Sequence, residues 1–381
     1  MSKKAAIVTY WDTSDNYGTI LQNYALQRFL LNHGIEPTTI REHIYGKQNL
    51  WAKLKRNLFS GGIVQIILKI FTSLCKREIA KANQKRDFDS FREKNIAYTD
   101  KTYENYADLK NEQNEYDFFI AGSDQIWNFG NDSVGDLRNR FKTVFFDFAS
   151  PSAKKISCAA SFGFPKFGKK IDNVIISYIK QFDFVSIRET SGVEYCKKLG
   201  LKSVVFQPDP TLLLEAASYR KLIEEKNKPD NKYILLYLLN NTSDFSITKL
   251  KKWAVRNNLD IVYVNGNLLF PKIDFNVKTY PTIPEWLALF DNAEFVFTNS
   301  FHGSVFSILF NKKFLTIRQS GKYNSQNSRV ECLLQQFNLG HRFFSKKFEA
   351  VKDEIDFESV NQKLKNIREN SPFVKYMTGL A

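Results

Sequence analysis

One histidine has the chemistry and the position to carry a proton in a reaction. His302 lies in a polar loop, residues 298–304 (TNSFHGS), directly after an apolar run, and the whole chain contains only four histidines. Histidine titrates near neutral pH, and the start of a helix stabilises an anion placed beside it. We therefore predict that His302 is a catalytic acid or base, with Ser300, Phe301 and Gly303 contacting substrate around it. The alternative is a histidine with a purely structural role.

Arg188 is the second candidate, because it ends a short apolar run, residues 184–188 (FVSIR). Its planar guanidinium pairs well with carboxylate and phosphate groups. An acidic partner within the protein would satisfy it equally, so a structural salt bridge is the alternative. Arg318 and Arg329, further along the chain, could add positive charge to the same site. Together these residues predict a site that handles an anion.

A polar loop at residues 122–128 (GSDQIWN) follows another apolar run. Ser123, Asp124 and Gln125 carry groups that suit sugar hydroxyls, and the ring of Trp127 could stack on a hexose. We predict Asp124 as a catalytic residue that orients or deprotonates an acceptor hydroxyl. A capped helix start with a buried tryptophan explains the same residues equally well.

The loop at residues 12–18 ends in Asn16, Tyr17 and Gly18, where the first helix begins. Exposed N–H groups at a helix start bind phosphate or carboxylate, so we predict that these three residues contact substrate. The chain has no GxGxxG and no GxxxxGK[ST] in this region, so neither the dinucleotide fingerprint nor the P-loop is present.

The elements that must position these loops alternate between strand-like and helix-like patterns. Residues 5–10 form an apolar, β-branched run, residues 19–32 place apolar side chains at helical spacing, and Gly34 can end that helix. The same alternation continues through strand-like runs at residues 37–44, 116–121, 155–161, 184–188 and 203–206, with a helix at 189–199. Such alternation predicts a parallel sheet covered by helices on both faces.

The pattern restarts after a Pro-rich break at residues 207–211 and a polar segment at 224–232. Strands are expected at 233–239, 260–264, 295–298 and 314–317, and helices at 244–257, 283–291, 304–310 and 328–337. We predict an α/β fold with two Rossmann-like domains facing a cleft, residues 1–212 and 213–345, followed by a helical tail, 346–381. Ligands in such sheets bind beyond the carboxyl ends of the strands, where the four polar loops lie.

Residues 47–94 interrupt the first domain with a basic helical insertion. They hold twelve Lys or Arg residues against four Asp or Glu residues. One interpretation is a helical insertion with a solvated basic face; the other is an amphipathic device that rests on an anionic membrane surface. The apolar stretch at 62–74 is too short to cross a bilayer, which needs roughly 20 residues.

Composition narrows the class of protein. The net charge of +15 attracts anions, but no RNA-binding signature, zinc-finger spacing or basic heptad array points to nucleic acid. The four cysteines form no C-x-x-C pair, which argues against a zinc site and a disulfide framework, and we expect no metal. The first residues, MSKKAAIVTYW, lack a signal-peptide pattern, so the expected location is the cytoplasm.

Several motifs in order resemble the polysaccharide pyruvyl transferase family. They are NYGTILQNYALQRFL (16–30), IAGSDQIWN (120–128), AASFG (159–163), SIRETSG (186–192), PDPTLLL (208–214), NSFHGSVFSILFNKKF (299–314) and NSRVECLL (327–334). The resemblance covers about 320 residues, and the ordered set is specific where each block alone is not. It implies a glycosyltransferase-B-like fold and a reaction that forms a pyruvate ketal on a sugar from phosphoenolpyruvate.

The same resemblance implies roles for single residues. Arg188 and the Phe301-His302 pair would contact the donor, and His302 would be the essential acid or base. Several members carry Arg two residues before this histidine, whereas this chain has Ser300. Donor binding here would therefore use another cation, such as Arg318 or Arg329, or a different donor.

The expected partners follow from that chemistry. Phosphoenolpyruvate is the donor substrate, no further cofactor is expected, and the acceptor is a sugar of a surface polysaccharide such as a capsule or exopolysaccharide, or its lipid-diphosphate-linked precursor. The basic insertion would then suit peripheral contact with the inner membrane face. Two alternatives stay open: a nucleotide-sugar-dependent glycosyltransferase of the same fold, and a non-catalytic glycan-binding protein.

Overall fold

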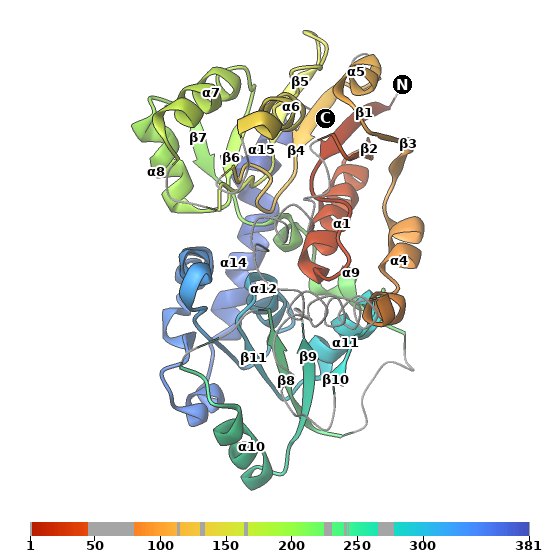
Figure 1. Cartoon of the computed structure of the whole chain (residues 1–381). Coiled ribbons are helices and arrows are strands. Elements are labelled where there is room, and N and C mark those ends of the chain that lie inside the picture. Colours follow the sequence, from red (N-terminus) through yellow and green to blue (C-terminus); the bar gives the residue numbers. More distant parts are fainter. Residues whose placement is uncertain are drawn as a thin grey trace, which may run out of the picture.

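The computed structural model describes residues 2–44, 80–112, 115–129, 134–163, 167–224, 231–239, 242, 244–265 and 278–380. Two parallel sheets, one in each half of the chain, form the framework (Figure 1). The first has the order β3-β2-β1-β4-β5. Its strands are β1 (Lys3–Val8), β2 (Ile35–Glu42), β3 (Tyr98–Tyr103), β4 (Phe118–Ala121) and β5 (Lys154–Ser157).

Two short strands extend the first sheet beyond β5. The strands β6 (Val185–Ile187) and β7 (Val204–Phe206) pair in parallel with each other. Isolated parallel bridges join Ile156 to Phe184 and Ala160 to Ile187, so β6 lies alongside β5. Arg188 and the segment that follows β7 are thereby brought to the same sheet edge as the loop after β4.

The second sheet repeats this plan in the other half of the chain, with the order β10-β9-β8-β11-β12. Its strands are β8 (Tyr233–Leu238), β9 (Asp260–Asn265), β10 (Lys278–Thr279), β11 (Phe295–Thr298) and β12 (Phe314–Thr316), and all their pairings are parallel. β8, β11 and β12 are buried along their length, as expected for apolar strands covered on both faces.

Helices connect the strands of both sheets. Those of the first half are α1 (Tyr17–Asn32), α4 (Phe88–Asn95), α5 (Tyr106–Leu109), α6 (Val134–Val144), α7 (Lys169–Ile179) and α8 (Thr190–Lys198). Those of the second half are α9 (Ala216–Arg220), α10 (Ile247–Arg256), α11 (Ile283–Asn292), α12 (Phe301–Leu309) and α13 (Asn327–Gln336). Short 3-10 turns lie at Lys110–Glu112, Pro210–Leu213, Gly321–Gln326, Gly340–Arg342 and Phe348–Lys352.

Helix α1 belongs to the first sheet but packs against both halves. Asn16 caps its start by accepting a hydrogen bond from the Thr19 N–H, and Gly34 follows its end with a φ of 72°. The buried ring of Tyr17 stacks on Trp286 of α11 at 5.3 Å, and its hydroxyl donates to the carbonyl of Pro281 at 2.7 Å. α1 therefore fixes the position of one half against the other.

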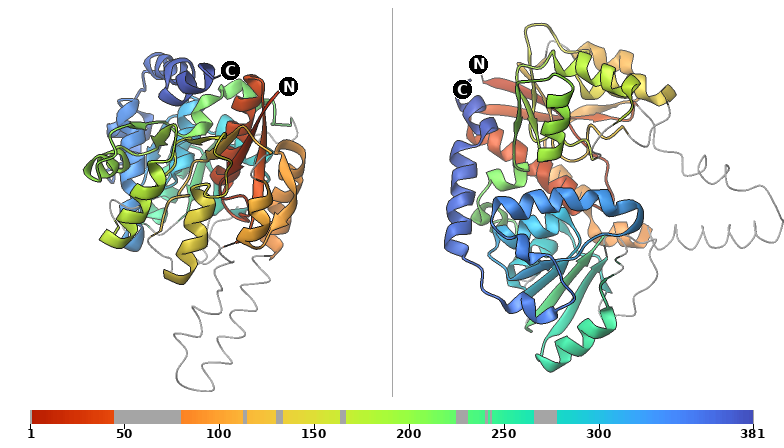
Figure 2. Two further views of the ribbon diagram at one scale, coloured as in Figure 1. Left: turned by 90° about the horizontal axis from the view of Figure 1, so that it is seen from above. Right: turned by 90° about the vertical axis from the view of Figure 1, so that its left-hand side faces the viewer.

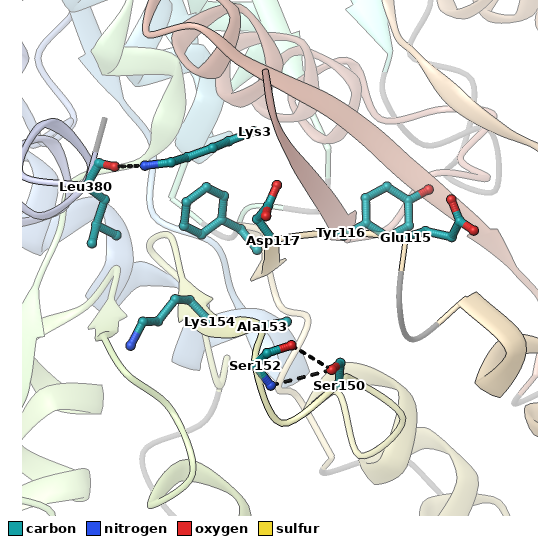
Figure 3. A pocket seen from close by; sticks show the side chains of 10 residues that line it. Lys3, Glu115, Tyr116, Asp117, Ser150, Ser152, Ala153, Lys154 and Leu380 are labelled. Carbon is teal, nitrogen blue, oxygen red and sulfur yellow. Dashed lines mark hydrogen bonds between the residues drawn. The ribbon is translucent and has the colours of Figure 1, made fainter. Parts of the chain in front are cut away.

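The C-terminal helices α14 (Phe357–Asn370) and α15 (Pro372–Thr378) lead the chain back to the first half. Phe373, Val374 and Met377 of α15 pack in one cluster with Ala5 and Phe29. Figure 2 shows α14 running along one side of the molecule, and the two chain ends beside each other. A pocket of about 400 Å³ at the amino ends of β1, β4 and β5 lies at these termini, with the Lys3 amine donating to the Leu380 carbonyl (Figure 3).

The alternation of strands and helices expected from the sequence is confirmed in both halves, with boundaries shifted by a few residues. The largest shift within the site is at α12, which begins at Phe301 rather than Ser304 because Ser300 caps it. The expected helical tail contains α14 and α15. Residues 47–79 of the expected basic insertion lie outside the described residues, and 80–86 and α4 are helical. No helix of the described residues is long and apolar enough to cross a bilayer.

Candidate functional site

His302 lies in the first turn of α12 and is only 6% exposed. The hydroxyl of Ser300 caps this helix by accepting a hydrogen bond from the Gly303 N–H at 3.2 Å. A Cβ on Gly303 would come within 2.3 Å of the Thr298 hydroxyl, so only glycine allows the helix to approach β11 this closely. The Ser300 cap and the close approach at Gly303 thus hold His302 at the start of a helix.

Gly18 allows the first turn of α1 to pack directly against the His302 ring. A Cβ built on Gly18 would lie 2.0 Å from His302 Nδ1 and 2.1 Å from its Cγ. The amino ends of α1 and α12, one from each half, therefore meet at this imidazole. Both helix ends carry partial positive charge, so their meeting point favours an anion.

Asp209, between β7 and the 3-10 turn Pro210–Leu213, connects His302 to the first half. Its Oδ2 atom lies 3.5 Å from His302 Nε2 and accepts hydrogen bonds from Arg188 Nη1 at 2.8 Å and Ser123 Oγ at 2.9 Å. Its Oδ1 atom accepts from the hydroxyl and the backbone N–H of Thr211. Burial alone would raise the pKa of Asp209, but the nearby His302 and Arg188 lower it well below its usual range.

Arg188 follows β6 and is 3% exposed. It donates to Asp209, its Nη2 lies 3.5 Å from Asp124 Oδ1, and its guanidinium carbon lies 4.7 Å from the centre of the Phe301 ring. Burial by itself would lower the pKa of Arg188, but the carboxylates of Asp209 and Asp124 reverse the effect and raise it. Arg188 is therefore a charged residue shared between two carboxylates and one aromatic face.

Asp124 lies in the loop after β4 with a φ of 65°, a left-handed conformation that Asp tolerates better than most residues. Its Oδ2 atom accepts a hydrogen bond from the Thr19 hydroxyl of α1 at 2.6 Å, and its Oδ1 atom lies 4.0 Å from Arg329 Nη1. Burial would raise the pKa of Asp124, yet Arg188, His302 and the Thr19 hydroxyl together lower it. Asp124 is thus ionised within the same buried cluster.

Arg329 of α13 supplies the second guanidinium of the cluster, from the second half of the chain. Burial and the neighbouring charge of Arg188 lower the pKa of Arg329 to about 10, although Asp124 acts in the opposite direction. Arg329 Nη2 donates to Gln326 Oε1 at 3.0 Å, and the Gln125 amide oxygen can accept from the same atom at 3.1 Å once the amide is turned toward it. The charges of Arg188 and Arg329 therefore act on each other within one buried site.

Three buried nitrogen atoms of this cluster have no hydrogen-bond partner within the described residues. They are Arg188 Nε, Arg329 Nε and His302 Nε2, which faces Asp209 only at 3.5 Å. A buried donor without a partner costs about 1–3 kcal/mol. Their concentration in one cluster of His and Arg residues fits a site that binds an anionic ligand.

The structure brings together most of the residues predicted from the sequence. Arg188, Asp124, His302, Phe301 and Arg329 form one cluster, which we call the anion cluster together with Asp209. Other predicted residues contact or shape it, either directly or through backbone caps: Gly18, Ser123, Gln125, Ser300 and Gly303.

Four residues that were expected to contact substrate do not belong to the anion cluster. Arg318 pairs with Glu331 at 2.5 Å and lies 4.0 Å over the Phe343 ring, and no described contact joins it to the anion cluster. Asn16 caps α1, and Tyr17 packs between the halves. Trp127 is fully buried against Phe145 and Phe162, so the sugar-stacking interpretation is wrong and the buried-tryptophan alternative is confirmed.

Two residues at this site were not predicted from the sequence: Asp209 of the anion cluster, and Thr19, which donates to Asp124. Asp209 lies in the Pro-rich break at residues 207–211, and Thr19 is the third residue of α1. An aspartate between two prolines directly after a strand was the available sign for Asp209, since it also lies at the carboxyl end of the sheet. No described group of three or more His, Cys, Asp or Glu side chains is arranged to hold a metal ion.

Comparison with solved structures supports the fold. The UDP-GlcNAc 2-epimerase from Methanocaldococcus jannaschii matches with a TM-score of 0.50 at 11% identity, covering 97% of this chain and 93% of that one. An α-glucosyltransferase in complex with UDP and DNA matches at 0.46 and 9% identity over 97% and 100% of the two chains. The glycosyltransferase SnogD from Streptomyces nogalater matches at 0.40 and 12% over 100% and 99%. The match to the epimerase, at a TM-score of 0.50, supports a fold of the glycosyltransferase-B type.

Comparison by sequence identifies the family. No curated protein matches the chain. A sequence model described as polysaccharide pyruvyl transferase matches residues 16–321, a span that holds Gly18, Asp124, Arg188, Asp209 and His302. Because this match covers most of the 381 residues, the chain belongs to the polysaccharide pyruvyl transferase family and is a transferase.

Proposed function

We propose that this protein transfers the enolpyruvyl group of phosphoenolpyruvate to a sugar and closes it into a pyruvate ketal. The observation that carries the proposal is the anion cluster. Two buried guanidinium groups and an imidazole lie where two helix amino ends meet, and each of the three side chains has a buried nitrogen without a hydrogen-bond partner in the described chain. Phosphoenolpyruvate brings a carboxylate and a phosphate, which together require several such donors.

Arg329 supplies a positive charge that Ser300 cannot provide. Several family members have an arginine at the position of Ser300, but here that side chain caps α12 and carries no charge. Arg329 enters the same cluster from α13 and lies 4.0 Å from Asp124. We therefore assign donor binding to Arg188 from the first half and Arg329 from the second. Arg318, which pairs with Glu331, is not part of this assignment.

The reaction needs one proton carrier and fixed positive charge near the phosphate. Protonation of the methylene carbon of phosphoenolpyruvate creates an oxocarbenium ion at C2, which the first sugar hydroxyl attacks. The bond from C2 to the phosphate oxygen then breaks, and the second hydroxyl adds to C2 and closes the ketal. Of the two hydroxyl protons, one is balanced by the new methyl group and the other leaves on inorganic phosphate.

His302 is the residue we assign as the proton carrier. Asp209 faces its Nε2 atom at 3.5 Å and also holds Arg188, so it positions both groups relative to each other. Asp124, held by Thr19 and Arg188, is assigned to orient or deprotonate an acceptor hydroxyl. In this mechanism the donor, the two acceptor hydroxyls and these side chains together carry out the transfer.

The biological setting we propose is the synthesis of a capsule or exopolysaccharide. The acceptor would be a sugar of the polysaccharide or of a lipid-diphosphate-linked precursor, modified in the cytoplasm at the inner membrane face. The net charge of +15, about half of it within residues 47–94, supports peripheral contact with anionic lipid. Co-sedimentation with anionic liposomes at physiological salt tests this part, and absence of sedimentation even at low salt would refute it.

The central experiment measures phosphate release from phosphoenolpyruvate against a panel of free and lipid-linked sugars. We expect release that depends on both donor and acceptor, with a product heavier than the acceptor by one pyruvate ketal in mass spectrometry. A protein that ignores phosphoenolpyruvate but hydrolyses or binds a nucleotide sugar would instead be a glycosyltransferase of the same fold. If His302→Ala keeps full cellular function, the protein is a glycan-binding protein rather than an enzyme.

A further inference from the structure

A second pocket opens beside the anion cluster, at the carboxyl ends of β1 and β4. It has a volume of about 370 Å³, within the range of roughly 300–1,000 Å³ typical of small-molecule sites. All ten residues that line it carry hydrogen-bonding side chains, and only one of them, Tyr10, offers an aromatic ring. A lining of this kind suits a ligand covered in hydroxyl groups more than an apolar one.

The pocket shares residues with the anion cluster. Asp124 and Thr19 line it and are hydrogen-bonded to each other at 2.6 Å. Asp124 also lies 3.5 Å from Arg188, and Thr19 follows Gly18, which contacts His302. A ligand in this pocket would therefore lie next to a donor held by the arginines.

The side chains that line the pocket are mainly acidic, although the chain as a whole is basic. The chain carries +15, yet the lining has three carboxylates, Asp12, Asp15 and Asp124, and one guanidinium, Arg140. Asp12 and Asp15 are exposed, with His43 Nε2 at 3.1 Å from Asp12 Oδ2, and Arg140 donates to the Tyr10 hydroxyl at 3.0 Å. Because Arg188 and Arg329 offset the charge of Asp124, the repulsion of a ligand carboxylate or phosphate in this pocket comes from Asp12 and Asp15.

We propose that this pocket is the acceptor subsite, and that it takes a sugar ring bearing no carboxylate or phosphate of its own. The inference rests on the proposed function and adds the charge class of the acceptor. Polar groups on opposite walls bind the ring hydroxyls, and Asp124 faces the pair that becomes the ketal. The phosphate groups of a lipid carrier would then lie outside the pocket.

The test compares two probes that differ in one group, methyl β-D-glucopyranoside and the corresponding glucuronide, which carries a carboxylate. Binding is measured by saturation-transfer NMR and calorimetry at low salt, together with the galacto and manno isomers of the neutral probe. We expect a neutral glycoside to bind at least about tenfold more tightly than its uronate counterpart, as like charges at short range require. Asp12→Asn with Asp15→Asn should reduce this preference to less than about threefold.

The matched control is Asp244→Asn, since Asp244 lines a separate pocket beside Lys249 and Phe348. It should leave the preference unchanged. A uronate that binds as tightly as the neutral probe would overturn the proposal. So would a double variant that behaves like the control, or no saturable binding of any neutral glycoside up to roughly 50 mM, well above a millimolar Kd.

Failure of this proposal is distinguishable from failure of the proposed function. Binding of phosphoenolpyruvate is measured separately, by the shift in melting temperature that the donor causes. If the donor does not bind but neutral glycosides bind with the expected charge preference, the transfer reaction is wrong and the sugar pocket stands. If the donor binds and the charge preference is absent, the sugar pocket is wrong and the proposed transfer reaction stands.

Discussion

The close packing of Gly18 against His302 predicts that Gly18→Ala strongly lowers turnover. The added methyl group would lie 2.0 Å from His302 Nδ1, whereas ordinary contact begins at 3.4 Å, so the imidazole must retreat by about 1.4 Å. A misplacement of about 1 Å in a catalytic group can cost about a hundredfold in rate. We therefore expect turnover to fall by about a hundredfold or more.

Stability should change far less than turnover. Overpacking costs typically about 1–3 kcal/mol, and alanine is favoured over glycine in a helix by about 1 kcal/mol. The two effects oppose each other, so the expected net loss of unfolding free energy is about 0–2 kcal/mol. The melting temperature, followed by circular dichroism, should accordingly fall by only a few degrees.

The assays are phosphate release from phosphoenolpyruvate and two-dimensional ¹H–¹⁵N spectra of the four histidine rings, which need no acceptor. The matched control is Gly340→Ala, because a Cβ on Gly340 meets nothing within 4 Å. We expect the His302 signals to move in Gly18→Ala and to stay in place in the control. Wild-type turnover and unchanged His302 signals in Gly18→Ala would refute the packing of α1 against this histidine.

The remaining predictions concern the charged groups. His302→Ala should lower turnover by about 10²–10⁴-fold with a nearly unchanged melting temperature; comparable losses of both would make the histidine structural. Arg329→Gln should raise the KM for phosphoenolpyruvate about tenfold to a hundredfold, and Arg318→Gln should leave it unchanged; equal effects would contradict the assignment of the second cation. Asp209→Asn should lower the unfolding free energy near pH 7 by about 3 kcal/mol or more, as expected for a broken buried ion pair. Because the folded-state pKa of Asp209 is lowered below the unfolded value of about 3.9, its stabilisation is complete above that value and is lost as the pH falls further. Urea denaturation of both proteins should therefore show the difference narrowing below about pH 4, and a constant difference would refute the pairing.

The order of strands and helices was predictable because apolar periodicity is a local property. The strand at Phe295–Thr298 and the helix at Tyr17–Asn32 follow from consecutive residues, and parallel strands place their following loops at one edge. Arg188, Asp124 and His302 could be chosen on that ground alone. Their meeting in one cluster follows from the common direction of the strands.

What escaped prediction depends on side-chain direction and on contacts between distant residues. Arg318 and Arg329 were both candidates for the second cation, yet one side chain turns to Glu331 and the other to Asp124. Asp209 bonds to Ser123, which lies 86 positions earlier, and no local pattern reports such a contact. Trp127 is a large ring after a strand, and only packing against Phe145 decides between burial and stacking on a ligand.

The route of the last helix bears on how the chain folds during synthesis. Phe373, Val374 and Met377 of α15 cover Ala5 and Phe29, which are made long before them. The first sheet cannot complete this face until α15 has left the ribosome, although domains generally fold in the order in which they emerge. During that interval the growing chain carries an apolar surface that chaperones can bind. Deleting residues 372–380 should therefore lower the yield of soluble protein although no residue of the anion cluster is removed.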